Sequence, residues 1–288
     1  MRVCLSCAAR FESAEWRCPV CGWTPPARGN WPMFAPELAA TNDGFSASFF
    51  PLLFEAEQNH FWFRSRNRLL IWALRSYFPG ATNLLEIGCG TGYVLSGIHR
   101  AEPTIECAGS ELLLEGLEFA ALRLPGVALA QMSALNIPYD GAFDVVGAFD
   151  VLEHISDDER ALAQMFQAVS PGGGVMITVP QHQFLWTVVD EHSHHKRRYS
   201  RADLIAKLRA AGFRDVCVTS FVSLLLPVML ALRAVRSRQR EFDELAEMRI
   251  GRTANAVMEW IMDAERALIK LGVRLPAGGS LLAVAHKP

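Results

Sequence analysis

The sequence predicts an α/β fold in which one parallel sheet is preceded by a small metal-binding module and followed by a helical insertion before its last strand. Three observations support this prediction. From about Leu52 onward, helical patterns alternate with short apolar segments, as in parallel α/β sheets. Four of the seven cysteines lie within the first 21 residues. A stretch of 58 residues, from Phe221 to Gly278, separates the last two predicted strands.

The composition is that of a soluble globular protein. The chain has 288 residues, 51% of them hydrophobic and 20% charged, so it can fill a core and does not resemble a disordered chain. The formal net charge of -2 argues against wrapping nucleic acid by bulk electrostatics, and no nucleic-acid partner is expected. No apolar run reaches the roughly 18 residues that span a membrane. Cys4 and Cys7 stand where a signal peptide would have its charged and apolar regions, so we expect a cytoplasmic protein.

The N-terminal cysteines form two close pairs, Cys4 with Cys7 and Cys18 with Cys21. Two thiolates from one tight turn reach one metal ion, and two such turns complete a tetrahedral site. We therefore interpret residues 1–28 as a ribbon that binds structural Zn²⁺, which supplies its folding energy. Iron is the minority alternative, and two disulfides fit poorly with a leaderless chain and three further lone cysteines. Dimer contact, partner docking and substrate binding stay open as roles for the ribbon.

Residues 29–56 are predicted to form a linker and N-terminal extension. Prolines recur from Pro25 to Pro36, and proline cannot continue a helix or a strand. We expect five aromatic residues to pin this segment to the next domain: Trp31, Phe34, Phe45, Phe49 and Phe50.

The remaining residues, 57–288, are predicted to form one domain. Short apolar runs predict strands at 83–88, 104–110, 143–149 and 174–179, and two final strands near 215–220 and 280–286. Helical periodicity predicts helices at 66–77, 92–100, 115–124, 157–169 and 201–211. Ser156 is the expected N-cap of the fourth helix, and Gly212 is expected to end the fifth.

The turn after the first of these strands carries the chemistry, with the sequence Glu86-Ile-Gly88-Cys-Gly90-Thr-Gly92. Glycines there permit positive φ and let backbone amides approach a ligand at a helix N-terminus. Glu111 closes the next strand, where a carboxylate can accept hydrogen bonds from both ribose hydroxyls. The leading glutamate and the missing third-glycine spacing argue against a dinucleotide and favour a different cofactor.

This turn resembles motif I of the class I S-adenosylmethionine (SAM)-dependent methyltransferases. Segments 109–111, 143–154 and 170–174 also match, so the resemblance covers roughly residues 57 to 220 and the last strand. It implies a Rossmann-like seven-stranded methyltransferase sheet and SAM as the cofactor. It further implies that the three motif glycines pass under the methionine part of SAM and that the glutamate after the second strand holds the ribose. The family's usual aspartate near the adenine is absent, and the residues predicted to complete the cofactor site are Glu86, Met132, Ser133 and Phe149.

The methyl acceptor is expected beyond the carboxyl ends of the strands, where ligands lie in open α/β sheets. The enzyme must mainly align and desolvate the acceptor, and a hydroxyl acceptor also needs a base. The first candidate segment contains Asp150, Glu153 and His154. It resembles the Glu-His step of O-methyltransferases of the ubiquinone-biosynthesis type, some of which use a divalent cation. Three interpretations stay open: His154 is the base, the three residues hold a cation, or they only shape the SAM pocket.

The second candidate segment runs from Asp190 to Tyr199 and contains three of the eight histidines. One interpretation is a site for an anionic acceptor, with His195 or Asp190 as the base and Arg198 and Tyr199 beside the substrate. The other is a solvated loop in which Arg198 and Tyr199 cap the following helix. Zinc binding is not expected here.

The third candidate segment is Glu57-x-x-His60-Phe-Trp62-Phe-Arg64. On a helix, Glu57, His60 and Arg64 would share one face. The segment resembles the lid helix ahead of motif I in a bacterial methyltransferase group with His-Phe-Trp-Phe-type sequences. That resemblance implies that His60, Trp62 and Arg64 close over SAM or the acceptor. An aromatic packing face is the alternative.

Residues 221–278 form an insertion, and long insertions at such places are usually functional lids. The apolar segment 224–232 is followed by arginines, a pattern that fits peripheral contact with a membrane or a lipid-linked substrate. These arginines are Arg233, Arg236, Arg238 and Arg240. The alternative is a helical cap or a homodimer face, and the acidic continuation from Glu241 to Glu247 dilutes the basic patch.

Together these patterns predict a SAM-dependent methyltransferase that acts on an oxygen or nitrogen atom of a small molecule, in secondary metabolism or in glycan or lipid-linked sugar assembly. One alternative is an RNA methyltransferase with the zinc ribbon as a recognition module, against which the near-neutral charge argues. The other is a non-catalytic SAM-binding scaffold that docks through the ribbon.

Overall fold

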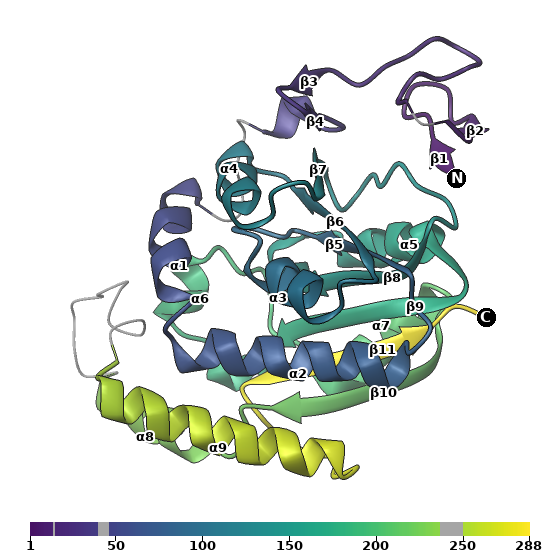
Figure 1. Ribbon diagram of the computed structural model, residues 1–288. Coiled ribbons are helices and arrows are strands. Elements are labelled where there is room, and N and C mark those ends of the chain that lie inside the picture. Colours follow the sequence, from purple (N-terminus) through teal and green to yellow (C-terminus); the bar gives the residue numbers. More distant parts are fainter. Residues whose placement is uncertain (14, 40–45, 237–249) are drawn as a thin grey trace.

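The computed structural model describes residues 1–13, 15–39, 46–236 and 250–288, and the side chains of 232–236 lie outside this description. A seven-stranded sheet with the order β10-β11-β9-β8-β5-β6-β7 forms the centre of the molecule (Figure 1). Only β11 runs antiparallel to its neighbours. The predicted Rossmann-like seven-stranded sheet is therefore confirmed. The strands are β5 (Asn83–Ile87), β6 (Glu106–Glu111), β7 (Ala128–Gln131), β8 (Phe143–Phe149), β9 (Val169–Pro180), β10 (Arg214–Phe221) and β11 (Ser280–His286).

Helices cover both faces of this sheet because its strands are apolar on both sides. Along β5, Leu84 packs into one core and Leu85 into the other, as the two-residue period of a strand requires. The first core receives side chains from α2 (Phe61–Tyr77), α3 (Tyr93–Ala101), α4 (Leu114–Arg123) and α9 (Arg252–Lys270). The second core receives side chains from α5 (Asp158–Ala168) and α7 (Arg201–Ala210). The central strands therefore have no solvent-facing side, and the site must lie at their ends.

Two helix boundaries differ from the prediction. Helix α5 is capped by Asp157, whose side chain accepts a hydrogen bond from the amide of Arg160, and the predicted cap Ser156 stands one residue too early. Helix α2 starts at Phe61, and the preceding helix α1 (Phe50–Ala56) ends before Glu57. His60 has extended backbone angles and its Nδ1 accepts from the amide of Trp62, so it caps α2. The predicted single helix with Glu57, His60 and Arg64 on one face is therefore wrong.

The N-terminal cysteine module, residues 1–28, packs against the edge of the main sheet. Strands β1 (Arg2–Val3) and β2 (Arg10–Phe11) pair within it, and the amide of Val3 donates to the carbonyl of Pro138. The Trp16 ring lies 4.5 Å from Phe34 and 5.4 Å from Tyr139. These contacts join the module to the main domain.

The segment after the module is more ordered than a tether. Strands β3 (Ala27–Arg28) and β4 (Trp31–Pro32) form a hairpin, and Met33 then bridges to Gln131 at the end of β7. The buried Phe34 and Phe50 belong to the predicted aromatic anchors, whereas Phe45 lies outside the described residues. Two short 3-10 helices, Pro36–Leu38 and Ala47–Phe49, precede α1.

The insertion contains helices α8 (Leu226–Arg236) and α9, which lie at one end of the molecule below α2 (Figure 1). The predicted basic patch begins in α8, whereas Arg238, Arg240 and the acidic continuation 241–247 lie outside the described residues. The first turn of the insertion is anchored by Glu265, whose carboxylate accepts from the amides of Val222, Ser223 and Leu224 at 2.6 to 2.7 Å. Val222 has a φ of 59°, which a β-branched residue rarely adopts, so this anchor holds a strained turn.

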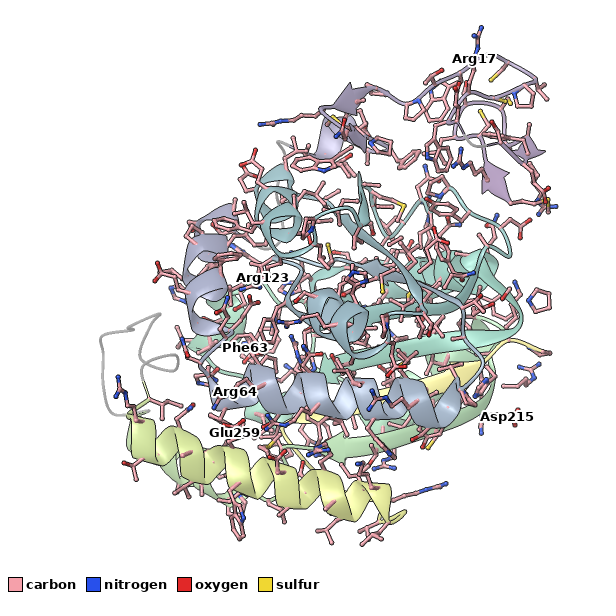
Figure 2. The ribbon with its side chains drawn as sticks, viewed as in Figure 1. Arg17, Phe63, Arg64, Arg123, Asp215 and Glu259 are labelled. Carbon is pink, nitrogen blue, oxygen red and sulfur yellow. The ribbon has the colours of Figure 1, made fainter. Side chains whose placement is uncertain are left out.

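Salt bridges connect the insertion to α2. Arg64 pairs with Glu259 of α9 (Figure 2), and Arg68 reaches both Glu259 and Asp263. No helix among the described residues has the length and apolar character needed to cross a bilayer.

Candidate functional site

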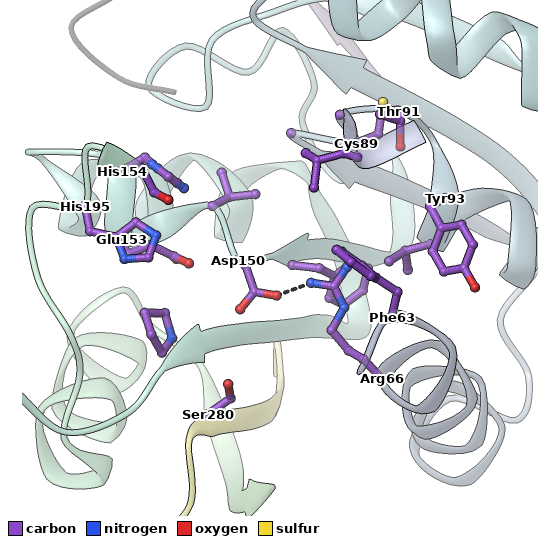
Figure 3. A pocket seen from close by; sticks show the side chains of 18 of the residues that line it. Phe63, Arg66, Cys89, Thr91, Tyr93, Asp150, Glu153, His154, His195 and Ser280 are labelled. Carbon is purple, nitrogen blue, oxygen red and sulfur yellow. Dashed lines mark hydrogen bonds and ion pairs between the residues drawn. The ribbon is translucent and has the colours of Figure 1, made fainter. Parts of the chain in front are cut away.

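A cavity of about 1380 Å³ lies at the carboxyl ends of the parallel strands. Figure 3 shows side chains from several elements pointing into it. Its walls come from the region of α1 and α2, the turn after β5, the ends of β6, β7 and β8, the loop before α7, and both ends of the insertion. Pockets for single small ligands usually measure roughly 300–1000 Å³. The cavity is therefore large enough for a cofactor and a second small molecule.

The glycine turn forms one wall of the cavity. Gly90 has a φ of 52°, and an added Cβ there would approach no atom closer than 3.8 Å, so its surface is open to a ligand. Gly88 and Gly90 line the cavity, whereas Gly92 does not. At Gly92, which has a φ of 74°, an added Cβ would come within 3.0 Å of the Ala120 backbone. Gly92 is therefore needed for the packing of α3 against α4.

Two buried glutamates face the cavity beside this turn. One oxygen of Glu86, Oε2, is buried without a hydrogen-bond partner among the described residues, and burial raises the pKa of Glu86 to about 8. Glu111 accepts from the amides of Gly90, Leu112 and Leu113 at 2.9, 2.8 and 3.1 Å. Burial nevertheless keeps the pKa of Glu111 above its ordinary value.

The other predicted cofactor residues, Met132, Ser133 and Phe149, also line the cavity. They follow β7 and end β8, so the parallel topology brings them to the same edge as the glycine turn.

A histidine and a buried aspartate meet on the opposite wall. His195 lies between the short helix α6 (Val188–His192) and α7, and its Nδ1 is 2.8 Å from Oδ1 of Asp190. Because a carboxylate only accepts, Nδ1 donates this hydrogen bond. Arg198 donates to both carboxylate oxygens, at 2.7 and 2.9 Å. His195 and Arg198 line the cavity, while Asp190 is fully buried behind them.

The charge of Asp190 is preserved by these partners. Burial alone would raise the pKa of the carboxyl, but the hydrogen bonds from His195 and Arg198 hold it below its ordinary value. An ionised Asp190 keeps the proton of His195 on Nδ1. In the neutral imidazole of His195 the lone pair is then on Nε2.

Glu153 and His154 lie beside His195, as Figure 3 shows. The rings of His154 and His195 are 4.7 Å apart, and one ligand atom from each of Glu153, His154 and His195 lies within 4.8 Å of the others. Burial, and then the neighbouring His195, lowers the pKa of His154 to about 3. Burial, and then the charge of Asp150, raises the pKa of Glu153 well above its ordinary value. His154 is therefore uncharged near neutral pH. The three side chains have donor atoms suited to a divalent cation.

The remaining predicted site residues separate into two groups. His60 and Trp62 line the cavity. Arg64 points to the insertion, where it pairs with Glu259. Tyr199 is fully buried in the second core, and its hydroxyl donates to Asp158 at 2.6 Å. Neither Arg64 nor Tyr199 contributes to the cavity wall, and Ser200, not Arg198 or Tyr199, caps α7 through its side chain.

Sequence reasoning missed Arg66. This residue is buried in the cavity wall, forms an ion pair with Asp150 (Figure 3), and its guanidinium lies 4.3 Å from the centre of the Trp62 ring. Asp150 has a φ of 58° and also accepts from Thr178 at 3.1 Å. The four-residue spacing between Trp62 and Arg66 was the available signal, because such residues are neighbours on a helix.

The four N-terminal cysteines form a second, separate site. Sγ of Cys4 is 3.6 Å from that of Cys21, Sγ of Cys7 is 3.7 Å from that of Cys18, and all four lie within 4.8 Å of one another. A tetrahedron with zinc–sulfur bonds of about 2.3 Å has edges of about 3.8 Å. The thiols are therefore spaced for one tetrahedral ion.

Comparison with known proteins shows which proteins the main domain resembles. The family model described as a methyltransferase domain matches residues 54–218, more than half of the chain. Norajmaline N-methyltransferase of Rauvolfia serpentina is 34% identical over 115 residues, 36% of this chain and 37% of that protein. Malonyl-[acyl-carrier protein] O-methyltransferase of Methylococcus capsulatus is 24% identical over 157 residues, 51% of this chain and 57% of that protein.

Among solved structures, a SAM-dependent methyltransferase of Thermotoga maritima has a TM-score of 0.52 and 20% identity, covering 83% of this chain and 98% of that chain. This likeness concerns the fold. The chain spans between about a third and three fifths of the length of the first curated relatives that it matches. The family model leaves the cysteine module and the whole insertion, residues 221–278, unmatched.

Proposed function

Because the chain belongs to the methyltransferase-domain family, we propose that it transfers the methyl group of SAM to an oxygen or nitrogen atom of a small molecule. The observation that carries this proposal is the pair of His195 and Asp190 on the cavity wall opposite the glycine turn. One wall then holds the cofactor, and the other offers a proton acceptor to the methyl acceptor.

The residues around the glycine turn fit SAM. The open surface at Gly90 admits a ligand against the backbone, and the orphaned Oε2 of Glu86 suits the ammonium group of the methionine part. We propose that Glu111 holds the ribose and that Met132, Ser133 and Phe149 surround the base; all four line the cavity. Phe149 and Met132 are buried apolar groups, which suits the aromatic adenine. When bound, SAM supplies an electrophilic methyl group on a sulfonium.

His195 is the proposed base. The Nε2 lone pair of the neutral ring can take the proton from an acceptor hydroxyl as the new bond to carbon forms. For an ammonium acceptor, it takes the proton before the freed amine attacks the methyl group. Asp190 is buried and acts as a positioning residue that fixes the tautomer and compensates the charge of the resulting imidazolium. The low pKa of His154 makes it a poor proton acceptor near neutral pH, so we assign it to the cavity wall next to His195. A cation held by Glu153, His154 and His195 is the competing proposal.

The cavity supports a small-molecule acceptor better than a nucleic acid. Its walls enclose apolar side chains from α2 and the insertion, and His60 and Trp62 are proposed to close over the bound ligands. Arg198 and Lys196 add cationic groups to the wall, which suits an acceptor with a carboxylate or phosphate, as in a glycan or lipid-linked sugar. The alternatives are an RNA methyltransferase and a non-catalytic SAM-binding scaffold.

We further propose that the cysteine module binds one structural Zn²⁺. The sulfur spacing supports it, and among its described residues the module buries only Cys4, Phe11 and Cys18 in a core of its own. So small a core cannot fold the module unaided, and a metal ion would supply the missing free energy.

Calorimetry tests the cofactor assignment. The protein should bind SAM and its demethylated product, and Gly90→Arg should abolish binding because its side chain fills the open surface of the turn. Gly126→Arg is the matched control, since Gly126 also has a positive φ and open space but lies outside the cavity wall. Failure of the wild type to bind SAM would contradict the proposal.

Turnover tests the reaction. Release of the demethylated cofactor should rise with phosphorylated or carboxylated hydroxy and amino compounds, and not with a structured RNA. Release with RNA alone supports the RNA alternative. Cofactor binding without release for any acceptor supports the scaffold alternative.

A further inference from the structure

Helix α9 has an apolar face that points away from the protein. Apolar residues recur every three or four positions along it and share one side of the helix. Trp260 is 71% exposed and Leu271 is 81% exposed. We call this stripe the outer face of α9; it comprises Thr253, Ala256, Val257, Trp260, Ala264, Ala267, Leu268 and Leu271.

The opposite side of the same helix packs on the protein, where Met262 and Ile269 are buried in the first core beside acidic side chains. Glu259 and Asp263 pair with arginines of α2, and the exposed fraction of Glu265 is 1%. The three acidic residues of α9 therefore all have partners within the protein. The apolar side chains of the outer face point to the surroundings of the protein.

The charges that remain exposed along this region are all basic. Between residues 252 and 276, all of which are described, the exposed charged residues are Arg252, Lys270 and Arg274. Apolar groups next to exposed cations fit the boundary between the headgroups and acyl chains of an anionic membrane. Tryptophan is also the side chain best suited to that boundary.

Helix α8 extends this surface at the same end of the molecule (Figure 1). Leu224, Val228 and Leu230 are exposed there. Val228 also lines the cavity, as do Met229 of α8 and Met258 of α9. The mouth of the cavity therefore borders the apolar surface.

We propose that the outer face of α9, together with the exposed residues of α8, docks on an anionic lipid bilayer. A second copy of the chain fits this face less well. Two-fold pairing would match the face with itself, and antiparallel helices would place Arg252 against Lys270 or Arg274 of the other copy. Such like charges repel, and the acidic side chains of α9 already pair with groups of their own chain.

Docking in this orientation brings the cavity mouth to the bilayer. The inference about the acceptor rests on the proposed methyl transfer. The acceptor is then a molecule whose polar end enters the cavity while its hydrocarbon tail stays in the lipid. Vesicle binding requires no turnover, so failure of docking can be distinguished from failure of the proposed reaction.

The test is co-sedimentation of the full chain with vesicles of phosphatidylcholine, alone or with about 30% phosphatidylglycerol. The protein should bind the anionic vesicles at least tenfold more tightly than the neutral ones, and raised salt should weaken the binding. Trp260→Ser should weaken it by roughly tenfold, since it removes the largest apolar group of the face. Leu122→Ser is the matched control, because Leu122 is equally exposed, at 72%, but lies on α4.

Charge variants give an independent readout. Lys270→Gln and Arg274→Gln should each weaken binding by about fivefold. Arg209→Gln, an exposed arginine of α7, should leave it unchanged. Calorimetry with SAM on every variant checks that the fold is retained.

Absence of binding to anionic vesicles by the folded wild type would overturn the inference. So would binding that survives Trp260→Ser and both charge variants together. A wild-type dimer that Trp260→Ser converts to a monomer, measured by light scattering, would assign the face to a second copy instead.

Discussion

His195 Nδ1 donates a 2.8 Å hydrogen bond to Asp190 Oδ1, and Arg198 binds the same carboxylate from its other side. Asp190 is fully buried, whereas His195 faces the cavity. The pair therefore consists of an accessible imidazole and an inaccessible carboxylate that orients it. We therefore propose that His195 contacts the acceptor and that Asp190 acts through His195.

We expect His195→Gln to lower kcat by roughly 10²–10⁴-fold, the usual contribution of a general base. Cofactor affinity should not change, because His195 lies across the cavity from the glycine turn. His192→Gln is the control, since His192 is exposed on α6 and does not line the cavity. Steady-state kinetics and calorimetry measure the two effects. An unchanged kcat in His195→Gln rules out the base assignment.

Cofactor affinity should depend on the protonation of Glu86. Burial raises the pKa of Glu86 to about 8, so the ligand-free carboxyl is mostly protonated between pH 6 and 7.5. An ammonium group bound against Glu86 favours the ionised carboxylate, so SAM binding releases a proton from Glu86. The affinity for SAM should therefore rise with pH in this window, by up to about tenfold per pH unit. Above about pH 7.8 the free α-amino group loses its own charge and the rise should stop.

Calorimetry in two buffers with different heats of protonation measures the released proton directly. Glu86→Gln should bind SAM more weakly and lose the pH dependence. Proton uptake on binding by the wild type contradicts the assignment of Glu86 to the ammonium group.

The cysteine module should contain one zinc ion per chain, measured by elemental analysis of protein purified without chelators. Cys18→Ser should lose the ion, because Cys18 is a buried member of the four-thiol cluster. Cys217→Ser should retain it, since Cys217 lies on β10, apart from that cluster. Chelation should increase amide exchange in residues 1–28 and leave the central sheet protected. Full zinc content in Cys18→Ser argues for another ligand set.

Glu265→Gln should lower the free energy of unfolding by about 1–3 kcal/mol, because one amide oxygen cannot replace a carboxylate that accepts from three backbone amides. The exposed Glu115→Gln on α4 should change it by less than about 0.5 kcal/mol. Urea unfolding followed by circular dichroism measures both. Equal stability of the two variants shows that the strained turn at Val222 does not depend on Glu265.

The central sheet and cofactor wall could be predicted because their signals are local. The alternation of Leu84 and Leu85 between two cores follows from an apolar strand, and Gly90 lies in a turn of recognisable sequence. Their meeting at one sheet edge follows from parallel topology. Short-range patterns and a general rule for parallel strands were enough.

The opposite wall could not be predicted with the same sharpness because it depends on contacts between distant residues. Arg66 pairs with Asp150, 84 positions away, and nothing near Arg66 signals this partner. The break before α2 depends on His60 capping the helix with its own side chain, which competes with a continuous helical pattern. Tyr199 follows a polar loop yet is buried, because Asp158 accepts from its hydroxyl.

Helix α2 links the cavity proposed for SAM with the surface proposed for the bilayer. Its Arg68 holds Glu259 of α9, while its Arg66, half a turn away, holds Asp150 at the end of β8. A displacement of α9 and a rearrangement around Asp150 therefore act on the same rigid element. Thermodynamic linkage makes the consequence reciprocal: whatever factor a bilayer applies to SAM affinity, bound SAM must apply to bilayer affinity. Vesicle affinity measured with and without SAM therefore gives the coupling free energy between the bilayer surface and the cofactor site.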